Sequence, residues 1–132
     1  MKQLLTAFLL FFFSIVNAQI TFEKGYFIDE KNIRTECYIN NVDWMSNPTE
    51  FEYKLNLIDA PAKTNSIKTV KEFGIDNISK YKRFAGKIER SSTMLSSLTS
   101  NQYPEWKEEV LFLKLLVNGE ASLYVYRDEN LK

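Results

Sequence analysis

Apolar and polar residues alternate along several short stretches of this chain, which is the pattern of half-buried β-strands. The alternation is cleanest over residues 50–55. The apolar set there is Phe51, Tyr53 and Leu55, and the charged set is Glu50, Glu52 and Lys54. One apolar and one charged face predict an antiparallel sheet with one wet side.

Residues 20–40 predict a β-hairpin. Two alternating stretches, 20–29 and 33–40, are separated by the polar turn at 29–32. In the first stretch the expected inward side chains are Ile20, Phe22, Tyr26 and Ile28, with Lys24 as an exception. In the second stretch they are Ile33, Thr35, Cys37 and Ile39.

The pattern changes at Thr69. Residues 69–72 have the spacing of a capping box, in which a Thr hydroxyl and a Glu carboxylate satisfy free amides at a helix start. Gly74 suits the left-handed residue after a helix end. We expect one or two helical turns with Val70 and Phe73 facing inward, and a second short helical turn over residues 78–81.

Residues 80–90 are rich in Lys and Arg, with aromatic residues between them. We expect a strand in which Phe84, Gly86 and Ile88 point inward. A polyanion-binding face is the alternative interpretation, because basic residues beside aromatics are typical of nucleic-acid surfaces. The serine-rich stretch 91–104 predicts a mobile loop or, alternatively, a flap over a ligand.

The last part of the chain predicts a second hairpin. Residues 110–117 are apolar on both faces except at Lys114, which is typical of a central or barrel strand. Asn118 and Gly119 favour a tight type I′ turn before a strand over 121–127. The chain stops soon afterwards, so we expect it to be the front of a longer protein, because so apolar an edge strand would invite aggregation.

Together these patterns predict an all-β fold of about seven short antiparallel strands with one short helical turn. The strands would form a small sheet, a half-barrel or a sandwich. Residues 19–132 would make a single β-rich domain.

The first eighteen residues have the three parts of a secretory signal. Lys2 precedes an almost unbroken apolar run over 4–16, and Val16-Asn17-Ala18 offers a cleavage site. The mature chain would then begin at Gln19. A membrane anchor is the alternative, but a span needs about 20 apolar residues and this run is shorter.

The composition argues against several kinds of partner, catalytic site and cofactor. Seventeen basic residues balance seventeen acidic ones, so charge gives no reason to expect a nucleic-acid partner. The chain has no histidine, which excludes Ser-His-Asp and Cys-His activation within it. The single cysteine, Cys37, is expected to be a small buried side chain rather than a disulfide partner. We expect no metal and no cofactor, since phosphate-loop, dinucleotide and calcium-loop motifs do not occur.

Paired carboxylates occur at Glu50/Glu52 and at Glu108/Glu109. A glycosidase needs two carboxylates on either side of a groove. Glu50 and Glu52 share the wet face of one expected strand, so solubility is their simpler role.

Aromatic side chains beside turns are the candidates for surface recognition, because a ring there can stack on a sugar or peptide. The candidate ligand-binding residues are Asp43, Trp44, Tyr103 and Trp106. Packing in the core is the alternative for both tryptophans.

Several short motifs resemble a group of flavobacterial exported proteins of unknown function. The motifs are Gly25-Tyr26-Phe27-Ile28-Asp29, Glu36-Cys37, Asn41-Val42-Asp43-Trp44, Asn47-Pro48-Thr49-Glu50-Phe51-Glu52-Tyr53-Lys54, Val70-Lys71-Glu72-Phe73-Gly74 and Lys107-Glu108-Glu109. The resemblance implies an N-terminal domain that often precedes an outer-membrane β-barrel. A GTPase label found among such proteins does not fit this chain, which lacks a phosphate loop.

The leading hypothesis is therefore an exported cell-envelope protein, a non-enzymatic binding or accessory domain of an outer-membrane-associated protein. Its partner would be an envelope protein or a glycan, and membrane association would come only through a C-terminal barrel outside this sequence. A secreted hydrolase that uses carboxylates is the alternative, and a structural spacer is the third.

Overall fold

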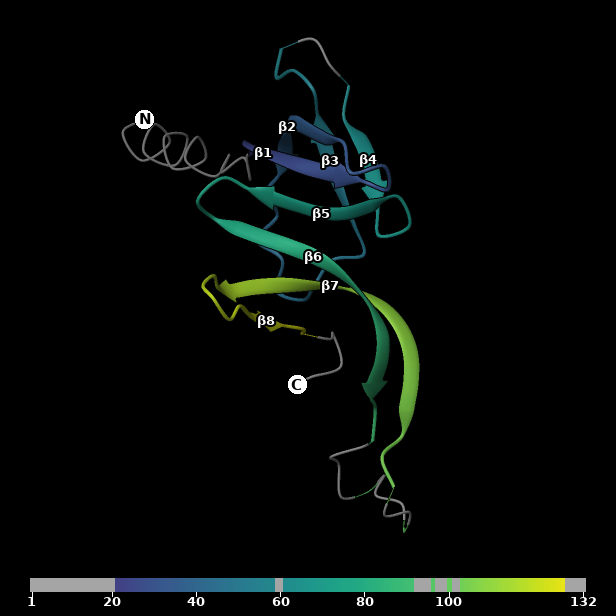
Figure 1. The fold of residues 1–132 in the computed structure, drawn as a ribbon. Helices are drawn as coiled ribbons and strands as arrows, with labels where there is room; N and C mark the ends of the chain where they lie inside the picture. Colours follow the sequence, from purple (N-terminus) through teal and green to yellow (C-terminus); the bar gives the residue numbers. More distant parts are fainter. Residues whose placement is uncertain (1–20, 59–60, 92–95, 97–99, 101–102, 128–132) are drawn as a thin grey trace, which may run out of the picture.

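One continuous antiparallel sheet organises the molecule in the computed structural model (Figure 1). The structure describes residues 21–58, 61–91, 96, 100 and 103–127, and within them it has eight strands. The strands are β1 (Phe22–Asp29), β2 (Arg34–Asn40), β3 (Glu50–Lys54), β4 (Lys63–Ser66), β5 (Val70–Ile75), β6 (Ser79–Glu89), β7 (Trp106–Val117) and β8 (Leu123–Val125). Their order across the sheet is β4-β3-β2-β1-β5-β6-β7-β8. The predicted all-β class is confirmed.

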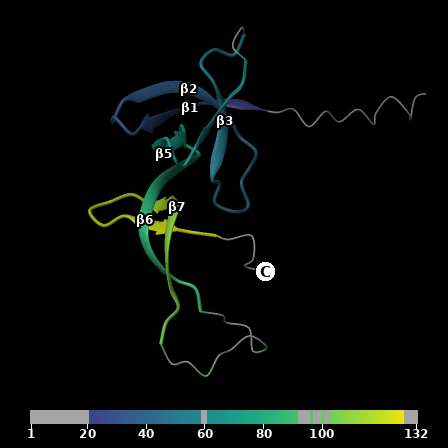
Figure 2. The same ribbon diagram turned by 90° about the vertical axis from the view of Figure 1, so that its right-hand side faces the viewer.

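The sheet is strongly curled, as its side view shows (Figure 2). β4 lies four positions from β5 in the sheet, yet only residues 67–69 connect them. Four strand spacings in a flat sheet would cover about 19 Å. Four residue steps reach at most about 14 Å, and the turn is folded back further by a bond from the Thr69 amide to the Ser66 carbonyl of 3.0 Å. The sheet must therefore roll into a half-barrel.

The core fills the concave side of the half-barrel. The ring of Phe73 on β5 stacks on Phe51 of β3 at 4.2 Å and on Tyr81 of β6 at 4.9 Å. Phe51 and Phe73 belong to strands that are three positions apart in the sheet, so their contact exists only because the sheet is curled. Phe112 of β7 meets the same ring edge-on at 5.0 Å. All four rings are at most 2% exposed.

Asn47 joins the long β2–β3 loop to the far end of the sheet. Its side-chain amide donates to the carbonyls of Phe112 (2.6 Å) and Val125 (2.9 Å). Its Oδ1 accepts from the Arg127 amide at 3.1 Å, and its own backbone amide donates to the Arg127 carbonyl at 3.0 Å. These four bonds to β7, to β8 and to the segment after β8 hold the loop over the open side of the half-barrel.

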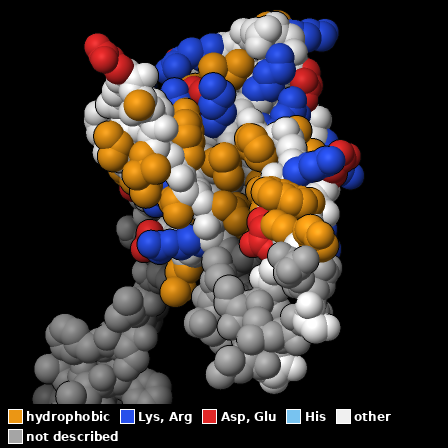
Figure 3. Space-filling model, turned by 60° about the horizontal axis from the view of Figure 1, so that its bottom comes forward, with side chains coloured by type: hydrophobic (Ala, Val, Ile, Leu, Met, Phe, Trp, Pro, Cys, Tyr) orange, Lys and Arg blue, Asp and Glu red, His pale blue; other side chains and the backbone are white. Residues whose placement is uncertain are grey.

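β7 is apolar on both faces, as predicted, and it lies between β6 and β8. Leu111 and Phe112 are successive residues that point to opposite faces, and both are buried. Towards the end of the hairpin Leu116, Val117 and Leu123 are each more than half exposed. Apolar side chains also form patches on the face that Figure 3 shows. Part of this apolar strand pair therefore remains in contact with solvent.

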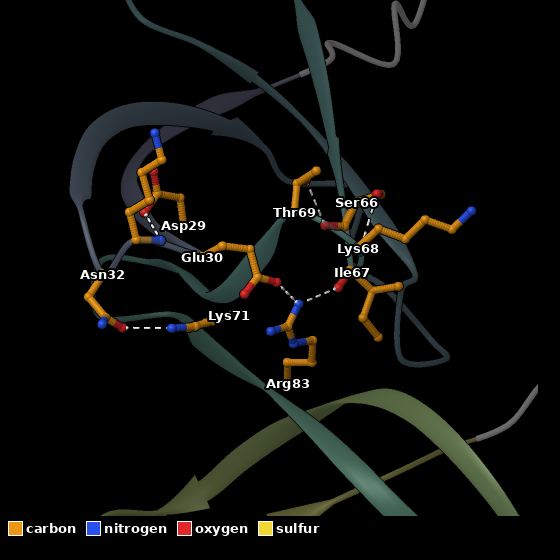
Figure 4. Close-up of polar contacts among 10 residues, drawn as sticks. Asp29, Glu30, Asn32, Ser66, Ile67, Lys68, Thr69, Lys71 and Arg83 are labelled. Atoms are coloured by element: carbon orange, nitrogen blue, oxygen red, sulfur yellow. Dashed lines mark hydrogen bonds and ion pairs between the residues drawn. The ribbon is translucent and has the colours of Figure 1, made fainter.

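Arg83 clamps one end of the half-barrel (Figure 4). Its guanidinium donates to the Ile67 carbonyl in the β4–β5 turn at 3.0 Å and pairs with Glu30 in the β1–β2 turn. The guanidinium keeps the pKa of the Glu30 carboxyl below its usual value. The β1–β2 turn is set by Asp29, whose carboxylate accepts from the amides of Lys31 and Ile33. Arg83 thus ties together two turns that the curl brings close.

The predicted helix near Val70 is wrong. Residues 70–75 form β5, and residues 79–81 belong to β6 rather than to a helical turn. The Thr69 hydroxyl, expected to cap a helix, instead bonds the Ser66 carbonyl at 3.1 Å. Val70 and Phe73 are both buried, as expected, because the pairing of β5 with β1 shifts register between Ile28 and Asp29. Such a bulge lets residues three apart share one face of a strand.

Two strands turn the opposite face inward from the one predicted. Phe27, not Tyr26, reaches the core from β1, and Tyr81, not Phe84, does so from β6. Tyr26 is covered on the outer face by the Arg34 guanidinium, 3.6 Å from its ring centroid. Both strands carry large apolar residues on both faces, so alternation alone does not choose between the faces.

The predicted type I′ turn is also wrong. Neither Asn118 nor Gly119 has a positive φ, and the loop spans residues 118–122 because the pairing of β7 with β8 shifts register after Leu115. The hairpins around residues 29–32 and 118–122 and the strand over 80–90 are confirmed.

The expected signal at 1–18, its cleavage site at Ala18 and Gln19, and most of the serine-rich stretch lie outside the described residues. Among the residues that are described, no helix is long and apolar enough to cross a membrane.

We expect Asn47→Ala to lower the free energy of unfolding by about 2–4 kcal/mol, because it removes three side-chain hydrogen bonds and leaves two carbonyls without that donor. Asn47→Asp should destabilise at least as much, since its carboxylate would face those carbonyls. Urea unfolding measures both. Asn56→Ala is the matched control, because Asn56 is exposed and accepts one local bond, from Ile58. Equal effects at both positions would contradict the role of Asn47.

Candidate functional site

The four predicted ligand-binding residues fall into two separate groups. Asp43 and Trp44 lie in the β2–β3 loop. Trp106 begins β7 opposite Glu89, and Tyr103 precedes it, at the end of the β6–β7 hairpin that extends away from β1–β5 in Figure 1. Trp106 is 58% exposed and Tyr103 is 70% exposed. The fold does not gather the four into one site.

Trp44 packs against core residues and also lines the surface. Its ring meets Phe73 at 5.8 Å and Tyr81 at 5.7 Å, edge-on in both cases. The preceding residue, Asp43, is exposed and has a φ of 47°, which Asp tolerates better than most residues. The Asp43 amide donates to the Asn41 side chain at 3.1 Å. This local turn aims Trp44 back toward the barrel, and the rest of its ring lines the surface.

Two grooves lie beside the loop. The first, here called the Asn40 groove, has a volume of about 380 Å³ and is lined by Asn40, Val42, Trp44, Glu50, Phe51, Glu52 and Thr64. The second, the Met45 groove, has a volume of about 410 Å³ and is lined by residues 44–50. Trp44 and Glu50 line both grooves.

Asn40 is the unusual residue of the Asn40 groove. It is 6% exposed, and its amide nitrogen donates to the Glu52 carboxylate at 2.9 Å. Its Oδ1 is buried and has no hydrogen-bond partner among the residues that the structure describes. A buried acceptor without a donor costs on the order of 1–3 kcal/mol. A donor that reached this atom would recover that energy.

The Asn40 groove presents acceptors of hydrogen bonds and few donors. Glu52 pairs with Thr64 of β4 in the sheet and bonds Asn40 of β2, so the three side chains form a row across three strands. Glu50 lies two residues before Glu52 on the same strand, and no Lys or Arg lines this groove. The groove therefore has a negative potential.

The pair Glu108/Glu109 has a different role. Glu109 makes a two-pronged ion pair with Arg90, with distances of 2.9 and 2.5 Å, and Arg90 lies 5.4 Å from the ring centroid of Tyr126. Glu109 raises the pKa of the Arg90 guanidinium. Glu108 is exposed. Glu109 thus holds Arg90, which joins the β6–β7 hairpin to Tyr126 in the segment after β8.

The largest of these surface grooves lies beside the β5–β6 turn. Its volume is about 530 Å³, and its walls include Tyr26, Lys80 and Leu115. The Tyr26 hydroxyl donates to Glu72 at 2.7 Å, and Lys80 pairs with Glu72 at 2.9 Å. Burial and the Glu72 hydrogen bond raise the pKa of Tyr26. Here the charged groups already satisfy one another, which makes the groove a weaker candidate.

No metal centre forms in the parts of the chain that the structure describes, since no three Cys, Asp or Glu residues gather closely enough. Cys37 is buried in the core as an unpaired thiol, as the sequence predicts. Burial raises its pKa to about 12. A thiol held neutral in this way is a poor nucleophile.

Sequence reasoning found Trp44 but did not single out Asn40. Alternation places Asn40 on the polar face of its strand, on the side opposite Ile39, and Glu50 and Glu52 are exposed, as expected. In the structure Asn40 is buried at the end of β2 and donates to Glu52 on the neighbouring strand β3. Alternation of residues carries no signal for such burial.

The Cys37 thiol should make the fold sensitive to alkali. Its pKa is raised from 9.0 to about 12, so its contribution to stability is complete below pH 9 and is lost as pH rises toward 12. We expect the free energy of unfolding to fall by about 1 kcal/mol between pH 8 and pH 10 from this group. The free energy of unfolding of Cys37→Ala, measured by urea titration, should fall by less over the same pH interval. Identical losses in both proteins would contradict the assignment.

We compared the chain with protein-family models, with curated proteins and with solved structures, and none of the three comparisons found a match. Function is therefore argued from the residues of this chain.

Proposed function

We propose that this chain is an exported cell-envelope protein that acts as a non-enzymatic binding or accessory domain of an outer-membrane-associated protein. The N-terminal basic residue, apolar run and Val16-Asn17-Ala18 support export. The observation that carries the binding role is the Asn40 groove, with a buried acceptor that lacks a donor. Its ligand would be presented by an envelope protein or a glycan.

The loop that forms the groove is held in place before any ligand arrives. Asn47 fixes one end of the loop through four hydrogen bonds to β7, β8 and Arg127. Trp44 fixes its middle against Phe73 and Tyr81. A pre-ordered surface loses little conformational entropy on binding, which is why binding residues are commonly placed on loops held by a rigid scaffold.

A secreted hydrolase is the second candidate, because two carboxylates, Glu50 and Glu52, line the same groove. They lie two residues apart on one strand and do not face each other from opposite walls. Glycoside hydrolysis requires carboxylates on both sides of the scissile bond. The geometry therefore favours binding over hydrolysis.

Export gives the first test. Expressed with its native N-terminus in a bacterium, the chain should accumulate in the periplasmic fraction with a mass that corresponds to residues 19–132. The basis is the cleavage of small-x-Ala sites by signal peptidase. Mass spectrometry of the fractionated protein measures this. Full-length protein in the cytoplasm would contradict the export proposal.

Binding gives the second test. Glycan and peptide libraries incubated with the folded protein should yield a ligand whose NMR shift changes centre on the Asn40 groove and which is released unchanged. Thr64→Trp should obstruct the groove and weaken binding by about tenfold or more, a loss of about 1.4 kcal/mol. Asn56→Trp, at another exposed position, is the control. Turnover abolished by Glu50→Gln would favour the hydrolase instead.

A further inference from the structure

We propose that the Asn40 groove binds a positively charged group, the ammonium or guanidinium of a basic side chain on an extended peptide that pairs with the edge of β4. This inference rests on the proposed binding function and names its ligand class. It follows from the polar atoms of the groove and from the position of the groove beside a strand edge.

The groove provides hydrogen-bond acceptors and negative charge for a cation. The acceptors are the carboxylates of Glu50 and Glu52, and Asn40, whose buried Oδ1 has no partner among the described residues, lies in the same lining. An ammonium group carries three donors and a guanidinium five, and neither has an acceptor. The aromatic ring of Trp44 in the same lining adds a favourable surface for a cation. An anion would face two carboxylates, and a neutral hydroxyl would not balance their charge.

The nearest basic residue of the same strand is engaged elsewhere. Lys54 follows Glu52 by two positions and so lies on the same face of β3. Its ammonium, however, lies over the ring of Phe22 at 4.9 Å from the centroid. Glu52 accepts the hydrogen bond of Asn40, and no Lys or Arg is among the described residues that line the groove.

The sheet shows how a peptide would deliver the charge. In the described part of the chain β4 pairs with β3 alone, so its other edge is available for an added strand. Thr64, Glu52 and Asn40 form one row across β4, β3 and β2. An added strand would lie about 4.8 Å beyond β4 and continue this row. A Lys or Arg side chain at the matching position can pass over the short Thr64 side chain and reach Glu52.

The test uses the mature protein and a set of acetylated, amidated hexapeptides. One peptide alternates threonine with lysine, and two others carry norleucine or glutamate in place of lysine. We expect the lysine peptide to bind, with shift changes at the side-chain amide of Asn40 and along β4, and the other two to bind at least about tenfold more weakly. Calorimetry or NMR titration measures the affinities.

Glu52→Gln separates charge from structure. The glutamine can still accept the Asn40 hydrogen bond but has no charge, so affinity for the lysine peptide should fall about tenfold. Glu36→Gln is the matched control, because Glu36 is an exposed carboxylate that already pairs with Arg34 on β2. Thermal melts of both variants check that the fold is intact.

Two results would overturn this inference alone, and a third would also overturn the proposed binding function. Lysine-peptide binding that is equal in Glu52→Gln and the wild type would overturn it. Binding of a neutral glycan in the groove, without binding of the lysine peptide, would overturn the ligand class and leave the proposed binding function standing. Failure of every peptide and glycan to bind would overturn both.

Discussion

The contact between Phe51 and Phe73 is the interaction on which the rest of the fold depends. These rings stack at 4.2 Å although their strands are three positions apart in the sheet. A flat sheet would hold the strands about 14 Å apart. The three-residue connection between β4 and β5 forces the roll, and burial of the aromatic rings stabilises it. Polar residues along β4 and charged residues on β3 remain outside, so the curl separates the core from the wet face.

The curl also explains why a long loop becomes part of the structure. A half-barrel has an open side through which solvent would reach Phe73 and Tyr81. The β2–β3 loop covers that side with Trp44 and is held there by Asn47. The grooves beside the loop follow from this closure, because an irregular segment laid over a regular sheet leaves spaces at its margins. The candidate site is therefore a consequence of how the half-barrel closes.

Much of this fold was predictable from the sequence, since β2 and β3 each carry one clearly apolar face. Where strands are apolar on both faces, as around Tyr26 and Tyr81, alternation could not choose the inner one, and long-range packing decided it. At Val70 a bulge produced helix-like spacing in a strand. Of the candidate site, Trp44 was predictable as an aromatic residue beside a turn. Asn40 was not, because it lies on the polar face of β2, and alternation does not show which polar residues become buried.

The energetics of Asn40 connect fold and function. A structural asparagine at this position would be expected to satisfy both ends of its amide, as Asn47 does with four bonds that include its backbone. Asn40 instead uses its donor on Glu52, and in the described part of the chain its acceptor has no partner. A valine of similar size would avoid that cost but would also remove the hydrogen bond that positions the Glu52 carboxylate. Under the proposed binding function, the stability given up at Asn40 is the cost of holding the Glu52 carboxylate in place for a donor.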